Sequence, residues 1–476
     1  MNADTTAMPR HDTTDLFALD QAHVWHPFTP MKQWRETEPL IIERAHDAFL
    51  IDTAGRRYID GTSSLWCNVH GHHVQQMDKA IRNQLHKVAH TTLLGLASPT
   101  SIELAERLCA IAPGRLNKVF YSDSGATAVE VALKMAVGYF YHRGQPQRRR
   151  FIRFTGAYHG DTTGCMSIGY SELFHLPFGA MCFPSLEAPA PDPCRVPANL
   201  VMAPRSPGQY WPSADVPFNA SLRDACLKQL RDLLEQHVHE VAAIVIEPLV
   251  QGAAGIVCHP TGFLRGVAEL ARQHGVLLIA DEVATGFGRT GEMFACDHED
   301  VCPDLLCLGK GISGGYLPLA ATLATDDIEQ AFCGALADRR TLFHGHTYTG
   351  NALACAAALA SLDLFEQRDL LNHIQRSARI IRHKLETLQE SPHVRDVRQR
   401  GIMTGIELCA DRATGLSPEP LHQTAHRLCM AMREDGVILR PLGDVIVLMP
   451  IPAMGHDTLH QMLDVVVQTI LRWDLK

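Results

Sequence analysis

Short apolar runs alternate with segments of helical periodicity through the middle of this chain, and this alternation constrains the fold most. Strands are predicted at 118–122, 151–154, 241–248, 276–281 and 304–310, and helices at 126–142 and 263–275. The apolar runs lack the polar alternation of a strand with one wet face, so these strands are expected to be buried on both faces. The pattern predicts an α/β domain built on a mainly parallel sheet.

The two ends of the chain have a different pattern. Amphipathic helices are predicted at 351–366, 368–390 and 420–435, beside short strands within GIMTGIEL and VIVLMP. We therefore predict three regions: 1–62 and 346–476, which together form a smaller α+β domain, and 63–345, which forms the large domain. Eight prolines lie in residues 189–217, and this density predicts a long surface or active-site loop.

Composition excludes several classes of protein. A chain of 476 residues that is 46% hydrophobic can bury a large core. The net charge of -9 comes without charged blocks beyond Arg148, Arg149 and Arg150, so neither nucleic acid nor an anionic membrane is an expected partner. The beginning of the chain has no apolar leader core, and no apolar stretch approaches the ~18 residues of a membrane span. We expect a cytoplasmic protein.

Cysteine and histidine are abundant but not arranged as ligands. The 14 cysteines include no C-x-x-C pair, which favours reduced core residues over disulfides or zinc. The clusters His70-Gly-His72-His73 and His344-Gly-His346 lack carboxylate or cysteine partners at ligand spacing. No metal site is expected.

One lysine occupies an unusual position. Lys310 ends an apolar run, LLCLGKGISGG, and has glycine on both sides. A surface lysine needs no such surroundings, whereas a lysine whose pKa is lowered by desolvation does. We interpret Lys310 as a reactive amine.

Two more polar positions follow predicted strands, where open α/β sheets bind ligands. Ser122-Asp123-Ser124-Gly125-Ala126-Thr127 joins a strand to a helix, and its backbone N–H groups could bind a phosphate; an ordinary serine N-cap would have the same sequence. Asp281 ends VLLIAD, where a pyridinium nitrogen or a structural cap would satisfy its carboxylate. A phosphate, a ring nitrogen and an aldehyde that needs an amine describe one ligand, pyridoxal 5'-phosphate (PLP).

The chain resembles the class III, fold-type I aminotransferases from about His23 to Leu475. DEVATGFGRTG and PDLLCLGKGISGGYLPLAAT carry this likeness, and they are shared across the family. The branch that it resembles more closely is that of the 7,8-diaminopelargonic acid synthases, which aminate 8-amino-7-oxononanoate in biotin synthesis. The stretches similar to that branch are WHPFTPM, DGTSSLWCNVHGH, YSDSGATAVEVALKMA, GAYHGDTTGCMSIG, HGHTYTGNALACA and LRPLGDVIVLMP.

The resemblance implies cofactor-binding roles. Lys310 would form the Schiff base with PLP and then move the proton in a ping-pong reaction, and Asp281 would hold the ring nitrogen. Tyr158 would stack on the ring, although a core tyrosine would look the same. Gly125 and Ala126 would bind the phosphate, with Thr347 reaching in from the second subunit of a homodimer.

The same resemblance implies substrate contacts. Arg440 would bind the substrate's distant carboxylate, unless it forms a surface salt bridge. Trp66 would line the substrate's apolar chain, unless it is a core tryptophan. Phe28 and Gly345 complete this group. Glu247, Gln251 and Asp123 are expected in the surrounding layer.

The amino donor stays open between S-adenosylmethionine and L-lysine. Family members that use S-adenosylmethionine typically have tyrosine in H-P-Y-T and two tryptophans after Ser-Ser, whereas this chain has Phe28 and Leu65-Trp66. A branch that takes lysine is more similar at these positions. Two alternatives come from other classes: a transaminase for ω-amino acids or diamines, and a non-enzymatic protein with the same fold.

Overall fold

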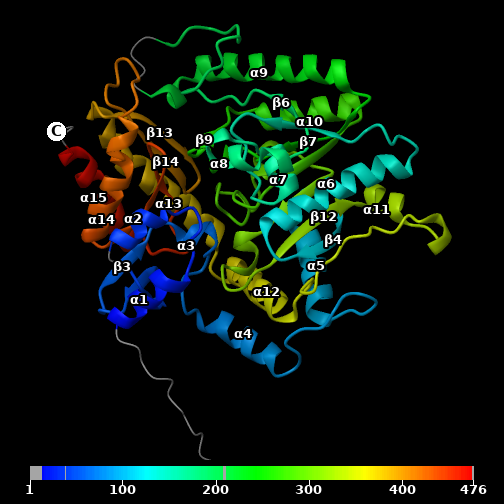
Figure 1. The fold of residues 1–476 in the computed structure, drawn as a ribbon, viewed down its shortest axis with the longest axis horizontal. Helices are drawn as coiled ribbons and strands as arrows, with labels where there is room; N and C mark the ends of the chain where they lie inside the picture. Colours follow the sequence, from blue (N-terminus) through cyan, green and yellow to red (C-terminus); the bar gives the residue numbers. More distant parts are fainter. Residues whose placement is uncertain (1–12, 38, 207–210, 474–476) are drawn as a thin grey trace, which may run out of the picture.

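A seven-stranded sheet forms the centre of the protein (Figure 1). The computed structural model describes residues 13–37, 39–206 and 211–473. The strand order is β4-β12-β11-β10-β7-β5-β6, and only β12 runs antiparallel to its neighbours. The prediction of a mainly parallel sheet is confirmed. The strands are β4 (Leu116–Ser122), β5 (Arg150–Phe154), β6 (Leu186–Ala188), β7 (Val241–Ile246), β10 (Leu277–Asp281), β11 (Leu305–Leu308) and β12 (Ala320–Thr325).

Helices cover both faces of this sheet, which explains why its strands are apolar throughout. Along β7, Ala243 and Val245 pack into one core, and Ile244 and Ile246 pack into the other. On the first side lie α6 (Gly125–His142), α7 (Thr163–Ile168) and α11 (Asp326–Phe332). On the second lie α5 (Pro99–Ile111), α9 (Val216–His237) and α10 (Phe263–His274).

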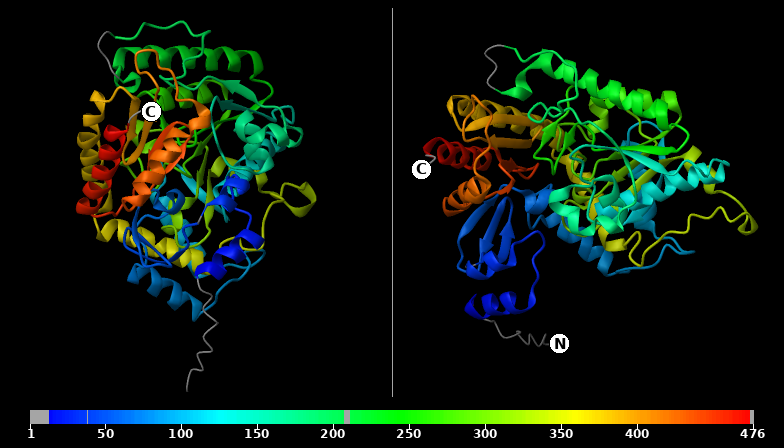
Figure 2. Two further views of the ribbon diagram at one scale, coloured as in Figure 1. Left: turned by 60° about the vertical axis from the view of Figure 1, so that its left-hand side comes forward. Right: turned by 45° about the horizontal axis from the view of Figure 1, so that its top comes forward.

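The N-terminal strands β1 (Ile42–His46), β2 (Phe49–Asp52) and β3 (Arg57–Asp60) lie beside the C-terminal strand β15 (Val437–Ile438), next to the large sheet (Figure 2). One small sheet has the order β1-β2-β3-β15, in which Val437 of the C-terminal region pairs with Ile59 in parallel. A second has the order β13-β14-β17-β16. The pairing of β3 with β15 explains how both termini build one α+β unit, while the boundaries at 62 and 345 stay a prediction.

The remaining elements complete these layers. The predicted helix at 351–366 is confirmed as α12 (Ala352–Gln367), but those at 368–390 and 420–435 are each divided into an α-helix and a 3-10 turn. The terminal elements are α1 (Thr13–His23), α2 (Met31–Glu36), β1 (Ile42–His46), β2 (Phe49–Asp52), β3 (Arg57–Asp60), α3 (Ser63–Trp66), α4 (Gln75–Leu85), α13 (Leu370–Leu385), η6 (Glu386–Glu390), β13 (Val394–Arg400), β14 (Met403–Leu408), η7 (Pro420–His422), α14 (Thr424–Glu434), β15 (Val437–Ile438), β16 (Arg440–Leu442), β17 (Val445–Leu448) and α15 (His456–Arg472). The other short elements are α8 (Glu172–His175), η1 (Leu176–Met181), η2 (Pro212–Ala214), β8 (Val250–Gln251), β9 (Val257–Cys258), η3 (Ala295–Glu299), η4 (Lys310–Ser313) and η5 (Leu336–Asp338).

The proline-rich segment differs in part from the predicted surface or active-site loop. Its residues 190–194 are buried, and Arg395 of β13 donates a 2.6 Å hydrogen bond to the carbonyl of Cys194. Arg195 forms an ion pair with Glu407 of β14 at 3.1 Å. This part of the segment therefore fastens the large domain to the C-terminal sheet. Residues 207–210 of the predicted loop lie outside the described residues.

Within the described part of the chain, none of the helices has the length and apolar character that a bilayer crossing needs. All 14 cysteines are free thiols. Among the same described residues, no three histidine, cysteine or acidic side chains gather closely enough to hold a metal ion.

Candidate active site

The predicted site residues follow four neighbouring strands at one edge of the central sheet. Asp281 ends β10 and pairs with Cys307 of β11, three residues before Lys310. Ala280 pairs with Ile246 of β7, so Glu247 follows beside Asp281. Tyr158 comes after β5, the next strand along. Because these strands are parallel, their carboxyl ends bring the four side chains to the same edge.

Lys310 is held as an unpartnered amine. Its Nζ lies 4.7 Å from the centre of the Trp66 ring, and among the described residues it forms no hydrogen bond or ion pair. Burial lowers the pKa of Lys310, and the negative charges of Asp281 and Glu247 offset only part of this effect. A larger fraction of neutral, nucleophilic amine is therefore present at neutral pH.

Asp281 is fixed by two donors. Its Oδ2 atom lies 2.7 Å from Nδ1 of the fully buried His159, and its Oδ1 accepts a 3.0 Å hydrogen bond from the Val283 N–H. Burial is the largest single influence and lowers the pKa of His159, but the hydrogen bond to Asp281 and the charges of Asp281 and Glu247 together outweigh it, so the pKa is raised. The carboxylate is thus oriented, with lone pairs left for a further donor.

Glu247 supports the loop that carries Tyr158. Its Oε1 accepts a 3.1 Å hydrogen bond from the Tyr158 N–H, and its Oε2 accepts a 2.9 Å one from the Gly252 N–H. Burial, together with the charge of Asp281, raises the pKa of Glu247 to about 7. The Tyr158 hydroxyl donates a 2.8 Å hydrogen bond to Asp161, and burial followed by this bond raises the pKa of Tyr158.

The β4–α6 connection lies against the Lys310 loop. A methyl group added at Gly309 would come 3.2 Å from the Gly125 Cα, and one at Gly125 would come 2.4 Å from a Val283 methyl group. Glycine at 309 therefore allows the two backbones to approach, and glycine at 125 leaves room for the Val283 side chain. Ser124 caps α6 by accepting a hydrogen bond from the Thr127 N–H, which leaves the N–H groups of Gly125 and Ala126 at the start of the helix for an anion.

Trp66 projects from a strained turn. Ser63, Ser64, Leu65 and Trp66 all have positive φ, between 47° and 75°, a region that costs non-glycine residues free energy. Asp60 holds this turn by accepting hydrogen bonds from the Ser64 N–H at 3.0 Å and from its hydroxyl at 2.7 Å. This clamp sets the position of the Trp66 ring over Lys310.

Four predicted site residues lie at the surface of the chain and away from these contacts. Phe28 is 57% exposed and packs edge-on against Phe174, with ring centres 5.9 Å apart. Gly345 and Thr347 are exposed, and the Thr347 carbonyl lies 2.8 Å from His90 Nε2. Arg440 is exposed at the start of β16. The reach of Thr347 into a second subunit stays a prediction.

The sequence model of the family described as Aminotransferase class-III matches residues 31–470. The chain belongs to the class III aminotransferases. The adenosylmethionine-8-amino-7-oxononanoate aminotransferase of Nitratidesulfovibrio vulgaris is 54% identical over 442 residues, covering 92% of this chain and 78% of that protein. The protein of the same name from Geobacter sulfurreducens is 47% identical, covering 96% of this chain and 97% of its own.

Solved structures agree with this membership. The crystal structure of the adenosylmethionine-8-amino-7-oxononanoate aminotransferase of Methanocaldococcus jannaschii has a TM-score of 0.89 at 41% identity, covering 97% of this chain and 100% of that one. An (S)-enantioselective omega-transaminase from Thermomicrobium roseum also has a TM-score of 0.89, at 32% identity, covering 97% and 99%. The predicted fold-type I architecture and the aminotransferase class are confirmed.

PLP is the cofactor of this class of aminotransferase, and the residues present fit it. The candidate site contains an unpartnered lysine amine, an oriented carboxylate and a capped helix start. Glycines there leave the backbone uncovered by side chains. These groups match the aldehyde, ring nitrogen and phosphate of PLP.

Sequence reasoning missed three residues that position side chains of the candidate site. His159 orients Asp281, Asp161 accepts from Tyr158, and the buried Arg289 donates to Ser63 Oγ at 3.0 Å and to the Pro450 carbonyl at 2.8 Å. All three lie inside the family-like stretches YHGD and GFGRTG. Their signal was present, but only the folded chain identifies their partners.

Proposed function

We propose that this aminotransferase transfers an amino group to 8-amino-7-oxononanoate and produces 7,8-diaminononanoate for biotin synthesis. Relatives that carry the corresponding name match 92% to 98% of the chain at 42% to 54% identity. The structural observation that supports the proposal most directly is the exposed position of Arg440. Among the described residues this exposed guanidinium has no carboxylate partner, and it is therefore available for the substrate's distant carboxylate.

Arg440 and Trp66 are connected through one small sheet. Ile438 of β15 pairs with Asp60 of β3, Asp60 holds the Trp66 turn, and Arg440 follows Ile438 by two residues. In our proposal, Trp66 lines the apolar chain of the oxononanoate, and Arg440 binds its far end. Phe28 and Gly345 complete this substrate-binding surface.

The residues at the strand ends perform the proton chemistry in this proposal. PLP supplies the carbonyl carbon and the electron-accepting ring. Lys310 would hold the cofactor through its Nζ, and as a neutral amine it would accept and return the proton. Asp281, oriented by His159, favours protonation of the ring nitrogen. Tyr158 would lie against the ring, and Gly125 and Ala126 would hold the phosphate.

The amino donor in this proposal is S-adenosylmethionine, with L-lysine as the alternative. Phe28 and Leu65 are 57% and 58% exposed, so both side chains are accessible to a donor. Neither can offer the hydroxyl or indole N–H that tyrosine or tryptophan would supply to a large sulfonium ion. We propose these two positions as the determinants of donor choice.

We further propose a homodimer with shared active sites in the cytoplasm. Thr347 is exposed on the segment before α12, which suits a residue that completes the phosphate site of a second subunit. The 14 free thiols suit a reducing compartment.

The deciding experiment is a donor half-reaction followed by a full turnover. The purified yellow enzyme is mixed separately with S-adenosylmethionine, L-lysine and 4-aminobutyrate, and loss of its visible absorbance is followed. The aminated enzyme is then given 8-amino-7-oxononanoate, and return of the absorbance is measured together with 7,8-diaminononanoate. Failure of the second step, with bleaching by 4-aminobutyrate, would contradict the proposal in favour of an ω-amino acid transaminase.

A further inference from the structure

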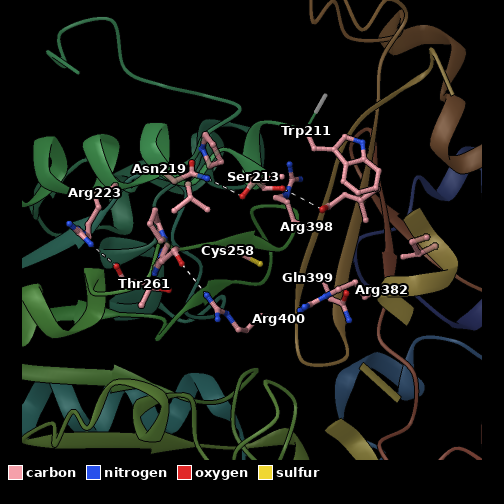
Figure 3. Close-up of a pocket in the computed structure, with 18 of the residues that line it drawn as sticks. Trp211, Ser213, Asn219, Arg223, Cys258, Thr261, Arg382, Arg398, Gln399 and Arg400 are labelled. Atoms are coloured by element: carbon pink, nitrogen blue, oxygen red, sulfur yellow. Dashed lines mark hydrogen bonds between the residues drawn. The ribbon is translucent and has the colours of Figure 1, made fainter. Parts of the chain in front are cut away.

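A second cavity lies between the large domain and the C-terminal unit, and Lys310 and the other site residues described above do not line it (Figure 3). Its volume is about 560 Å³. The large domain contributes α9 and the loop from β9 to α10, and the C-terminal unit contributes α13, η6 and β13. An occupant of this cavity would therefore contact both parts of the chain.

The cavity has an excess of positive charge. Four arginines line it, against the single carboxylate of Glu386. Arg398 is already paired with Asp396 and Glu407, and Arg223 with Asp224. Among the described residues, Arg382 and Arg400 form no ion pair with any carboxylate, so their charges are left for an anion.

Several buried polar groups that line the cavity have no hydrogen-bond partner among the described residues. They are both ring nitrogens of His259, Nε of Arg400, Nε1 of Trp211 and Oδ1 of Asn219. The His259 side chain is only 1% exposed, and burial, aided by the charge of Arg400, lowers its pKa to about 3. A buried N–H without an acceptor is costly, so the wall of this cavity contains donors that no described residue satisfies.

Part of the lining is apolar. Trp211 and Leu385 contribute large hydrophobic surfaces, and Pro260 lies between His259 and Thr261 in the connecting loop. The volume is in the range of sites for small organic molecules and exceeds what an inorganic ion needs. The combination suits a molecule with an apolar body and one charged end.

We propose that this cavity binds a small organic oxyanion, namely a carboxylate or a phosphate monoester on a short apolar body. The oxyanion accepts hydrogen bonds from Arg382 and Arg400, whose guanidinium groups have the donor geometry for either group. The apolar body lies against Trp211 and Leu385. Since the ligand bridges α13 and the β9–α10 loop, its binding stabilises the folded enzyme.

The test is calorimetric titration of the PLP-loaded enzyme with hexanoate, hexyl phosphate and inorganic phosphate. The variants are Arg382→Gln and Arg400→Gln, and Arg379→Gln is the matched control because it lies on the same helix and does not line the cavity. Any binding of the probes at the PLP site should be the same in the wild type and in the three variants. Arg382 is exposed, so its substitution should not prevent folding.

We expect hexanoate or hexyl phosphate to bind at least about tenfold more weakly to both cavity variants, with Arg379→Gln unchanged. The preferred probe identifies the oxyanion, and it should raise the melting temperature of the wild type and the control only. Identical titrations in all four proteins would overturn the proposal. Equal binding of inorganic phosphate would overturn the assignment to an organic ligand, and absence of cavity binding at about 10 mM probe would overturn the proposal itself.

Discussion

The Gly252→Ala substitution tests whether the Trp66 ring is positioned by its backbone contact. An added methyl group would lie 2.8 Å from Cζ3 of Trp66, whereas ordinary carbon contacts are about 3.5–4.0 Å. The ring must therefore move by roughly 1 Å, or the loop must strain by about 1–3 kcal/mol. The hydrogen bond from the residue 252 N–H to Glu247 is kept by alanine, so the change is confined to the ring.

Because Trp66 lies over Lys310, this displacement should reduce catalysis. A misplacement of about 1 Å near reacting groups costs up to about 100-fold, so we expect kcat/KM for 8-amino-7-oxononanoate to fall by about 10- to 100-fold. The assay is steady-state kinetics of the PLP-loaded enzyme. Gly455→Ala is the control, since a methyl group there meets no atom within 4 Å.

A double-mutant cycle separates this contact from a general loop effect. In a Trp66→Ala background the methyl group at position 252 has no ring to displace, so Gly252→Ala should change kcat/KM less than about twofold. An equal loss in both backgrounds would refute the reasoning, as would full activity of Gly252→Ala with Trp66 present.

Four further predictions concern single residues. Lys310→Ala should lose the yellow absorbance and at least about 10⁴-fold in kcat; a spectrum like that of the wild type would exclude it as the cofactor lysine. Arg440→Ala should raise KM for 8-amino-7-oxononanoate about 10- to 100-fold, and an unchanged KM would end its carboxylate role. The pKa of Glu247 is raised from 4.5 to about 7, so as the pH rises from 4.5 to 8 the cofactor-free wild type should lose about 3 kcal/mol of unfolding free energy relative to Glu247→Gln. Urea unfolding at both pH values measures this, and an equal change of the midpoint in the two proteins would contradict it. Glu407→Ala removes the carboxylate shared by Arg195, Arg395 and the buried Arg398, which keeps only Asp396, and should cost about 3–5 kcal/mol in urea unfolding; a loss below about 1 kcal/mol would contradict the role of this cluster.

The sequence was most informative where local pattern and burial agree. The apolar runs at 241–248 and 276–281 predicted strands, and β7 and β10 occupy these positions. Lys310 and Asp281 were recognised because a charge at the end of an apolar run needs a chemical reason. β6 was missed, since a strand as short as Leu186–Ala188 carries too little periodicity to be recognised. β12 (Ala320–Thr325) was also missed, although it is six residues long and almost entirely buried.

The sequence did not predict contacts between residues that lie far apart in the chain. His159 meets Asp281 across 122 positions, and Arg289 meets Ser63 across 226. No local propensity predicts the left-handed turn from Ser63 to Trp66 either, because tertiary hydrogen bonds hold it against its intrinsic cost. The cavity around His259 likewise arises only where two domains meet.

The sequence by itself determined the α/β class and the family and predicted Lys310 as the reactive amine, because these depend on residue type and on spacing along the chain. The tertiary structure alone decided which side chains orient Asp281, what holds Trp66 over Lys310, and where unpaired arginines remain. Those properties depend on distances through space, which follow from the packing of the sheet and the joining of both termini rather than from any local pattern.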